Sequence, residues 1–242
     1  MNFKITIQYD GANFYGWAAQ PNKRTLQQTL VDHFQNLFKL DEVKLYGSGR
    51  TDRFVHAKGQ VFNVHLTNLK IDSDQLKKAL NASLDDDLKV IDVVAVDNSF
   101  HAQYDAINKT YEYVIDTTHF SLFERNYCWQ INQQINLNKL KEALAIFVGE
   151  FDFLSYSTSE LYDTTRTINF INVKEENQYI KIYINANGFL KNMVRMIVAA
   201  SVDYSLDKVE LDQLKQWLKE PKKGASTKLA PGCGLYLLEV NY

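Results

Sequence analysis

The sequence predicts an α/β fold of the α+β kind, in which two lobes each combine strands with helices. Apolar residues alternate with polar residues in several short segments, as in half-buried strands, and recur at helical spacing in others. Both halves of the chain repeat this order, which is compatible with ferredoxin-like or split βαβ lobes. We expect an N-terminal lobe of residues 1–105 and a C-terminal lobe of residues 106–242. Their mixed, mainly antiparallel sheets are expected to meet at a central cleft, within a single compact unit.

In the first half, alternating apolar residues from Phe3 to Tyr9 predict a strand, followed by a loop rich in glycine and aromatic residues. Thr25 is the expected N-cap of a helix, and Ser73 is the expected N-cap of a second helix that ends near Ser83. The apolar run "LKVIDVVAV" predicts a buried strand. The strands expected up to residue 116 are 3–9, 43–47, 60–66, 88–96, and the pair 100–106 and 109–116.

In the second half, residues 136–149 predict a helix that Gly149 ends, and residues 166–186 predict a hairpin with its turn at Glu176–Asn177. A long helix is expected to open at Gly188, in "GFLKNMVRMIVAASVDYSL", and a shorter one covers "ELDQLKQWLKE". The last expected element is the strand "GLYLLEVNY".

Composition is that of an ordinary globular chain. Hydrophobic residues make up 45% and charged residues 23% of the 242 residues, enough to bury a substantial core. The start, "MNFKITIQYDG", has no long apolar stretch, and no apolar run approaches the roughly 18 to 20 residues that a membrane span needs. The two cysteines, Cys128 and Cys233, are too few for a disulfide framework. We expect a soluble, reduced, cytoplasmic protein with no membrane partner.

Cations gather near glycines and loop signals, although the net charge is −2. Phosphate binding depends on such local clusters rather than on net charge, so the charge balance does not exclude RNA. The cations that could take the phosphates of an RNA backbone are Lys23, Arg24, Arg53, Lys58 and Lys191.

The sequence shows no motif for a metal ion or a nucleotide cofactor. His56, His65 and His101 lack an HxH, HExxH or CxxC context, and neither GxxxxGK[ST] nor GxGxxG occurs. The run Asp85–Asp87 is typical of a solvated helix end. We therefore expect no metal ion and no cofactor.

The stretch "YGSGRTDRFVHAKGQ", Tyr46 to Gln60, places one aspartate among cations and glycines. An Asx-type turn with surface arginines is one interpretation of Asp52. In the other, a carboxylate held near the guanidinium groups of Arg50 and Arg53 stays ionised and serves as a nucleophile or a base. The glycines allow a bulky ligand to approach the backbone, and the cations can take its phosphates.

Two other segments carry candidate side chains. In "NKTYEYVI", Tyr111 and Tyr113 alternate onto one strand face, where rings can stack on a base or pack as ordinary core residues. In "NGFLKNMVRMIV", Arg195 lies within an apolar run, where an unpaired guanidinium is costly. We expect it to have an anionic partner, for which Asp52 is the natural candidate.

These residues carry a resemblance to a known family. "GSGRTDRFVHAKGQVFNVH" resembles the GRTDxGVHAxGQ signature of tRNA pseudouridine synthases of the TruA type. The likeness runs the length of the chain. The other segments that follow the family's order are "YDGANFYGWAAQPNKRTLQQTL", "NASLDDDLKV", "SFHAQYDAINKTYEYVI", "GEFDFLSY", "TTRTINFINV", "GFLKNMVRMIV" and "APGCGLYLLEVNY".

The resemblance implies a two-lobed pseudouridine synthase fold and a homodimer. It also implies an enzyme that isomerises uridine to pseudouridine without a cofactor, in the anticodon stem-loop of tRNA at positions 38, 39 and 40. Asp52 would be the catalytic aspartate, and Arg50 beside it would help to flip the base out. Tyr111 would pack on the target base, Arg195 would pair with the aspartate, and Leu235 would line the pocket.

Three positions depart from the family's pattern. The glycine of GVHA is Phe54 here, the glycine after MVRxxV is Ala199, and APPxGL is "APGCGL". None of them is the aspartate, tyrosine or arginine that would carry the chemistry. The catalytic loop must, however, accommodate a bulky side chain at Phe54.

Two other classes of protein stay open at this point. A non-catalytic RNA-binding module of ferredoxin-like lobes would use the tyrosines and cations but would not need an Asp–Arg pair. A metal-dependent nuclease would need clustered carboxylates, which the sequence does not show. Conversion of a C1′–N1 bond into a C1′–C5 bond is redox-neutral, which fits the lack of cofactor motifs. For that conversion Asp52 could attack C1′ or remove the C2′ proton.

Overall fold

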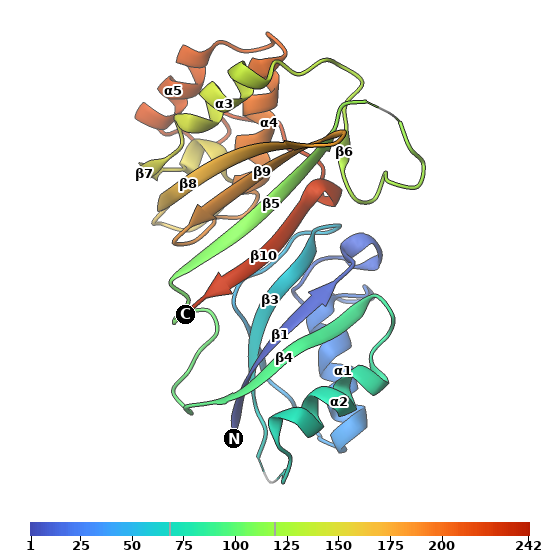
Figure 1. Ribbon diagram of the computed structural model, residues 1–242. Coiled ribbons are helices and arrows are strands. Elements are labelled where there is room, and N and C mark those ends of the chain that lie inside the picture. Colours follow the sequence, from blue (N-terminus) through green and yellow to red (C-terminus); the bar gives the residue numbers. More distant parts are fainter. Residues whose placement is uncertain (68, 119) are drawn as a thin grey trace. The chain divides into compact units, whose positions relative to one another are not determined.

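A computed structural model describes residues 1–67, 69–118 and 120–242 (Figure 1). Contacts divide the chain into two compact units, Met1–Ile107 with Tyr236–Tyr242, and Asn108–Leu235. The sequence placed the division at 105/106 and the closing strand in the C-terminal lobe. Residues Tyr236–Tyr242 instead group with the first unit, because they pair with one of its strands. The expected mixed α/β class is confirmed, since each unit combines a sheet with helices.

The sheet of the first unit has the strand order β4-β1-β3-β10, and β2 pairs with β3. Its strands are β1 (Asn2–Tyr9), β2 (Leu45–Gly47), β3 (His56–His65), β4 (Leu88–Val96) and β10 (Leu235–Asn241). All of these pairs are antiparallel except β3 with β10. Helices α1 (Leu26–Phe38) and α2 (Ser73–Ser83) cover one face of the sheet (Figure 1). Phe3, Ile5 and Ile7 of β1 are buried in the core of this unit.

Strand β4 was expected to be buried, and this prediction is wrong. Its residues alternate between buried and exposed, and Ile91 and Val94 are 37% and 40% exposed. The reason is that α1 and α2 cover only one face of the sheet, so β4 is half-buried (Figure 1).

Of the two expected helix N-caps of the first unit, the structure confirms the position of Thr25 and moves the other by one residue. Asp72, not Ser73, caps α2, in a capping box with Gln75. Thr25 occupies the N-cap position of α1 but makes no side-chain capping bond. The first amides of α1 are satisfied by a neighbouring loop instead, since Leu26 N donates to Gly16 O at 3.1 Å and Gln27 N donates to Trp17 O at 2.9 Å.

The segment "FHAQYDA", residues 100–106, is not a strand, contrary to the prediction. Side chains form hydrogen bonds with its backbone groups, in place of the hydrogen bonds that a neighbouring strand would supply. Asn63 Nδ2 donates to Phe100 O at 3.3 Å, and Asn63 Oδ1 accepts from Ala102 N at 2.9 Å. Tyr242 OH donates to Ala102 O at 2.8 Å. These bonds depend on residues far away in sequence, which local periodicity does not reveal.

The sheet of the second unit has the strand order β5-β9-β8-β7, and the short β6 pairs with β5. Its strands are β5 (Asn108–Asp116), β6 (Trp129–Gln130), β7 (Gly149–Asp152), β8 (Thr165–Glu176) and β9 (Tyr179–Ala186). These pairs are antiparallel except β5 with β6. The helices are α3 (Leu137–Ala145), α4 (Met193–Ser205) and α5 (Leu211–Lys219), and α3 packs on α4 (Figure 1).

Helix α4 begins at Met193 rather than at Gly188, where the sequence predicted its start. Asn192 has a left-handed backbone with φ of 66°, which cannot continue a right-handed helix. Thr158 holds this bend, since its backbone N donates to Lys191 O at 3.1 Å and its Oγ1 accepts from Asn192 Nδ2 at 2.8 Å.

Two other boundaries of the second unit move by a few residues. Helix α3 ends at Ala145, and Gly149 begins β7 instead of ending the helix. The turn between β8 and β9 is formed by Asn177 and Gln178, one residue later than predicted, with Asn177 in the left-handed region.

No helix in the described part of the chain combines the length and apolar character that a membrane span requires.

Candidate active site

The loop that joins β2 to β3, residues 48–55, carries Asp52 and is fixed to β3 by buried hydrogen bonds. Gln60 of β3 is fully buried, and its Oε1 accepts from Ser48 Oγ at 2.7 Å. Its Nε2 donates to Gly49 O at 3.0 Å, and Ser48 N donates to Val61 O at 2.7 Å. The first residues of the loop are therefore attached to the middle of β3.

The next part of the loop is attached to the segment around Trp17. Trp17 N donates to Thr51 O at 3.0 Å, and Tyr9 OH shares a 2.8 Å hydrogen bond with Thr51 Oγ1. Gly16 has φ of +87°, and a Cβ there would lie 2.7 Å from Thr51 O, so only glycine fits. Asp52 follows directly and is half-buried. Its carboxylate is thus carried by a backbone that is fixed from two directions.

Phe54 closes the loop with an unusual backbone. Asp52 O accepts from Val55 N at 3.2 Å, which closes a four-residue turn whose third residue is Phe54 with φ of 66°. Turns with positive φ at this position favour glycine. The bulky side chain is accommodated because it is 39% exposed and lies under the Arg53 guanidinium, 4.2 Å from the ring centroid. The position keeps a glycine-like backbone although its residue is Phe.

Two of the predicted RNA-binding cations meet on one aromatic ring. Lys23 Nζ lies 4.5 Å and Arg53 Cζ lies 4.3 Å from the ring centroid of Tyr15. Both cations are exposed, and they come from segments thirty residues apart in the chain. The sequence predicts a loop rich in glycine and aromatic residues here but no role for Tyr15, because nothing local indicates which cations reach its ring.

Arg24 is engaged differently from Lys23. Its NH1 is 2.6 Å from Asp87 Oδ2 and its NH2 is 2.8 Å from Asp85 Oδ2, and its guanidinium lies 4.1 Å from the Phe14 ring centroid. The hydrogen bond with Arg24 holds the pKa of Asp87 below its usual value, and the same bond raises the pKa of Arg24. Asp85 and Asp87 are therefore ion-pair partners, which corrects the expectation of a merely solvated run.

The other candidate cations of the first unit lie near the same loop. Arg50 is exposed within it. Lys58 is exposed on β3, with its Nζ 5.1 Å from the ring centroid of Tyr236. Around half-buried Asp52 the structure therefore places Arg50, Arg53 and the ring shared by Arg53 and Lys23.

In the second unit, Tyr111 and Tyr113 lie on the same face of β5, as their spacing predicts. Tyr111 is 8% exposed and packs edge-to-face on Phe189, with the ring centroids 5.0 Å apart. Tyr113 is fully buried, donates from its OH to Pro231 O at 2.8 Å, and has its pKa raised by burial. Tyr113 is thus a core residue, and Tyr111 is nearer the surface.

Arg195 and Leu235 border the same region of the second unit. Arg195 Nε donates to Ala230 O at 2.7 Å, and its NH1 donates to Asn192 Oδ1 at 3.1 Å. Gly234, next to Leu235, packs so closely on β5 that a Cβ there would lie 2.9 Å from the Tyr113 ring. The segment 230–235 therefore links Arg195 to the tyrosine strand. Asp52 belongs to the first unit and Arg195 to the second, and their pairing stays a prediction.

Two lysines of the second unit have different environments. Lys191 is exposed just before α4. Lys109, at the start of β5, has its pKa lowered to about 8 by burial and, secondarily, by Arg166. The sequence placed Lys109 beside the tyrosines but carried no signal for this shift, which depends on the folded surroundings.

Comparison of the sequence with known proteins shows which family the chain belongs to. A family model described as tRNA pseudouridine synthase matches residues 5–105 and 143–242. The chain is 53% identical to tRNA pseudouridine synthase A of Ureaplasma urealyticum over 242 residues, covering 100% of both. It is 39% identical to that of Malacoplasma penetrans, covering 100% of both. It is 40% identical to that of Mycoplasma genitalium, covering 98% of this chain and 96% of the relative.

Among solved structures, the archaeal box H/ACA sRNP Nop10-Cbf5 complex shows only a slight likeness to this chain. Its TM-score is 0.37 at 11% identity, and the match covers 95% of this chain and 58% of that chain. The sequence comparisons decide the matter: the chain belongs to the tRNA pseudouridine synthase family, a class of isomerases. The expected family is confirmed.

Replacement of Phe54 tests the glycine-like backbone. A left-handed backbone costs a residue with a Cβ about 1–2 kcal/mol, whereas glycine adopts it freely. We expect Phe54→Gly to be more stable than Phe54→Ala by about 1 kcal/mol, because both variants lose the aromatic ring and only alanine keeps the strain. Urea denaturation of the two variants measures this difference. Equal stabilities would show that φ at this position is not constrained.

Proposed function

We propose that this protein isomerises uridine to pseudouridine in the anticodon stem-loop of tRNA, at positions 38, 39 and 40, with Asp52 as the catalytic aspartate. The observation that carries the proposal is the half-buried Asp52 on a loop fixed by Gln60 on one side and Trp17 on the other. Catalytic groups work best when the backbone that carries them is held rigidly. A surface aspartate in an ordinary turn would not need these buried bonds.

The reaction breaks the bond between C1′ of the ribose and N1 of uracil, and forms a bond between C1′ and C5. The proton on C5 leaves as the product regains its aromatic form, so the conversion is redox-neutral. Asp52 acts either as a nucleophile at C1′ or as a base toward the C2′ proton. The base must first leave its stack, which costs a few kcal/mol, and Arg50 on the same loop is the residue that we assign to this step.

The second unit supplies the other substrate contacts of the proposal. Tyr111 packs on the target uracil, because its ring is at the edge of the buried tyrosine face and is oriented by Phe189. Leu235 lines the base pocket, beside the closely packed Gly234. Arg195, held by Ala230 and Asn192, is the proposed partner of the Asp52 carboxylate.

The RNA backbone is assigned to exposed cations. Lys23 and Arg53 both pack on the Tyr15 ring. Arg50 lies on the loop that carries Asp52, and Lys58 lies on β3, which follows that loop. Together these four residues give the first unit a local cluster of positive charge. Lys191 is the corresponding cation of the second unit. Arg24 is left out of this set, because two carboxylates hold its guanidinium.

The protein is further proposed to be a cytoplasmic homodimer, in which one tRNA crosses both subunits. The support is size: an L-shaped tRNA is long compared with a single 28.0 kDa chain. Light scattering at micromolar concentration should give twice the mass of the chain. A monomer with full activity would contradict this assembly.

The catalytic assignment is tested with Asp52→Asn, which keeps the shape of the side chain but removes its charge. Pseudouridine formation should fall by about 100-fold or more, because the nucleophile or base is lost. Tritium release from tRNA labelled at C5 of uridine measures turnover, and filter binding should show tRNA affinity within a few-fold of wild type. Asp92→Asn, an exposed aspartate on β4, is the matched control and should keep full activity. An Asp52→Asn variant with more than a few per cent of wild-type turnover would remove the assignment.

The backbone assignment is tested by salt dependence. Each neutralised phosphate adds about 0.7 to 0.9 to the slope of log K against log salt, so the combined change of Lys23 and Arg53 to Ala should flatten the slope by about one to two units. Turnover at saturating tRNA should change little. Lys77 and Lys78 on α2, both changed to Ala, form the charge-matched control, and their slope should equal that of wild type. If the slope of the Lys23 and Arg53 variant equals that of the Lys77 and Lys78 variant, the RNA backbone does not bind at Lys23 and Arg53.

A further inference from the structure

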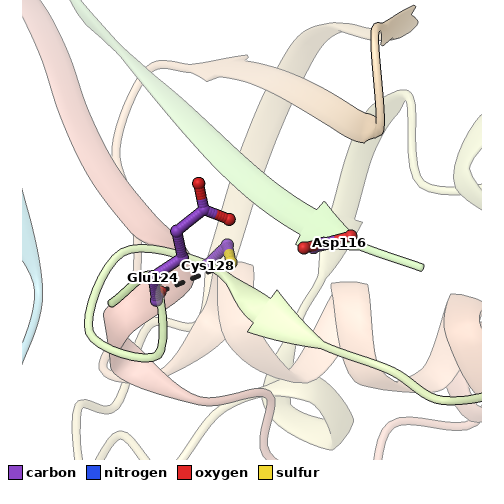
Figure 2. Close-up of side chains that lie close together, drawn as sticks. All are labelled: Asp116, Glu124 and Cys128. Carbon is purple, nitrogen blue, oxygen red and sulfur yellow. Dashed lines mark hydrogen bonds between the residues drawn. The ribbon is translucent and has the colours of Figure 1, made fainter. Parts of the chain in front are cut away.

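A cluster of potential metal ligands lies in the second unit and includes none of the residues assigned to catalysis. Asp116 is the last residue of β5, and Glu124 and Cys128 belong to the connection from β5 to β6 (Figure 2). One ligand atom from each of the three side chains lies within 4.8 Å of the others. The sequence did not reveal the cluster, because its spacing matches no standard metal-binding motif.

Asp116 is the member of this cluster that most needs a partner. The residue is 1% exposed, and its Oδ1 accepts from Thr118 N at 2.9 Å and from Thr118 Oγ1 at 3.0 Å. Its Oδ2 is buried and has no hydrogen-bond partner among the residues that the structure describes. Figure 2 shows one carboxylate oxygen of Asp116 on the side nearer to Cys128. A buried carboxylate oxygen without a partner is costly, so this atom points to a missing positive ligand.

The other two side chains are brought together by a local turn. Tyr127 N and Cys128 N donate to Glu124 O at 2.8 and 3.2 Å, and Cys128 Sγ lies 3.5 Å from the same oxygen (Figure 2). Tyr179 OH donates to Glu124 Oε1 at 2.7 Å, and this bond raises the pKa of Tyr179 to about 12, so the hydroxyl stays a donor. An outer hydrogen bond of this kind orients metal-binding carboxylates in known sites.

We propose that Asp116, Glu124 and Cys128 bind a divalent transition-metal ion of the zinc type. Zinc takes thiolate sulfur at about 2.3 Å and carboxylate oxygen at about 2.0–2.2 Å, usually in a tetrahedron. Such a geometry places ligand atoms roughly 3.4 to 3.6 Å apart. The cluster is somewhat wider, so the turn from Glu124 to Cys128 closes by about 1 Å on binding, and water takes the fourth position.

The ion neutralises charge that the described side chains leave unbalanced. No salt bridge reaches Asp116 or Glu124 in the part of the chain that the structure describes. A thiol that binds a metal ion gives up its proton, so Cys128 would bind the ion as a thiolate. The bound ion would join Glu124 and Cys128 of the connection between β5 and β6 to Asp116 at the end of β5.

Metal titration of the full-length protein tests the proposal. The protein is first freed of metal ions with a chelator, which is then removed. It is titrated with Zn²⁺ by calorimetry, and with Co²⁺ as an optical probe of thiolate ligation. We expect one ion per chain, a thiolate-to-cobalt charge-transfer band, and a rise in Tm of about 5 °C or more when Zn²⁺ exceeds its Kd by 100-fold. Cys128→Ser, Asp116→Asn and Glu124→Gln should each weaken Zn²⁺ binding by at least about tenfold.

Cys233→Ser is the matched control, because Cys233 is the other cysteine and its Sγ donates to Cys128 O at 3.4 Å. It should keep the affinity and the cobalt band, which Cys128→Ser should lose. Wild-type chain that binds no Zn²⁺ at one-to-one stoichiometry overturns the proposal. Binding that persists in every ligand variant that folds overturns it equally, and so does a cobalt band that depends on Cys233.

Discussion

The position of the proposed catalytic aspartate depends on one short backbone segment, Gly16–Trp17. Its two carbonyls accept from the first amides of α1, and Trp17 N donates to Thr51 O, one residue before Asp52. The left-handed Gly16 packs so closely on Thr51 that no side chain fits between them. The same two residues therefore accept from the first amides of α1 and fix the loop that carries Asp52. A shift of α1 would be transmitted to Asp52 through them.

The loop that carries Asp52 combines buried hydrogen bonds with a strained residue. Gln60 uses both atoms of its buried amide on Ser48 and Gly49, so the loop's attachment to β3 leaves little freedom. Phe54 bears the opposite feature, a left-handed backbone that favours glycine. The surrounding bonds outweigh this local cost. Residues with such backbones are tolerated where the rest of the structure fixes the conformation, and catalytic loops are common places for them.

The two units deal with acidic groups in different ways. In the first unit, the Arg24 guanidinium balances the negative charges of Asp85 and Asp87. Because Arg24 also packs on the Phe14 ring, these contacts join the loop that carries Phe14 to the residues just before β4. In the second unit, Asp116 is more deeply buried and its carboxylate bonds only to the neighbouring Thr118 among the described residues. An acid at the surface can be left to water, whereas a buried one needs a counter-charge, and this is the reason for proposing a metal ion at the Asp116 cluster.

The sequence alone determined the alternation of strands and helices, the family, and the candidate residues Asp52, Tyr111 and Arg195. Apolar periodicity is local, and the loop motif is contiguous, so both can be read without a fold. Tertiary structure decided what depends on distant partners. The segment 100–106 is not a strand, because Asn63 and Tyr242 form hydrogen bonds with its backbone. Arg24 forms ion pairs with Asp85 and Asp87. Asp116 lies close to Cys128, which follows it by twelve residues in the chain. Hydrogen bonds and charges act through space, and their partners are known only once the chain has folded.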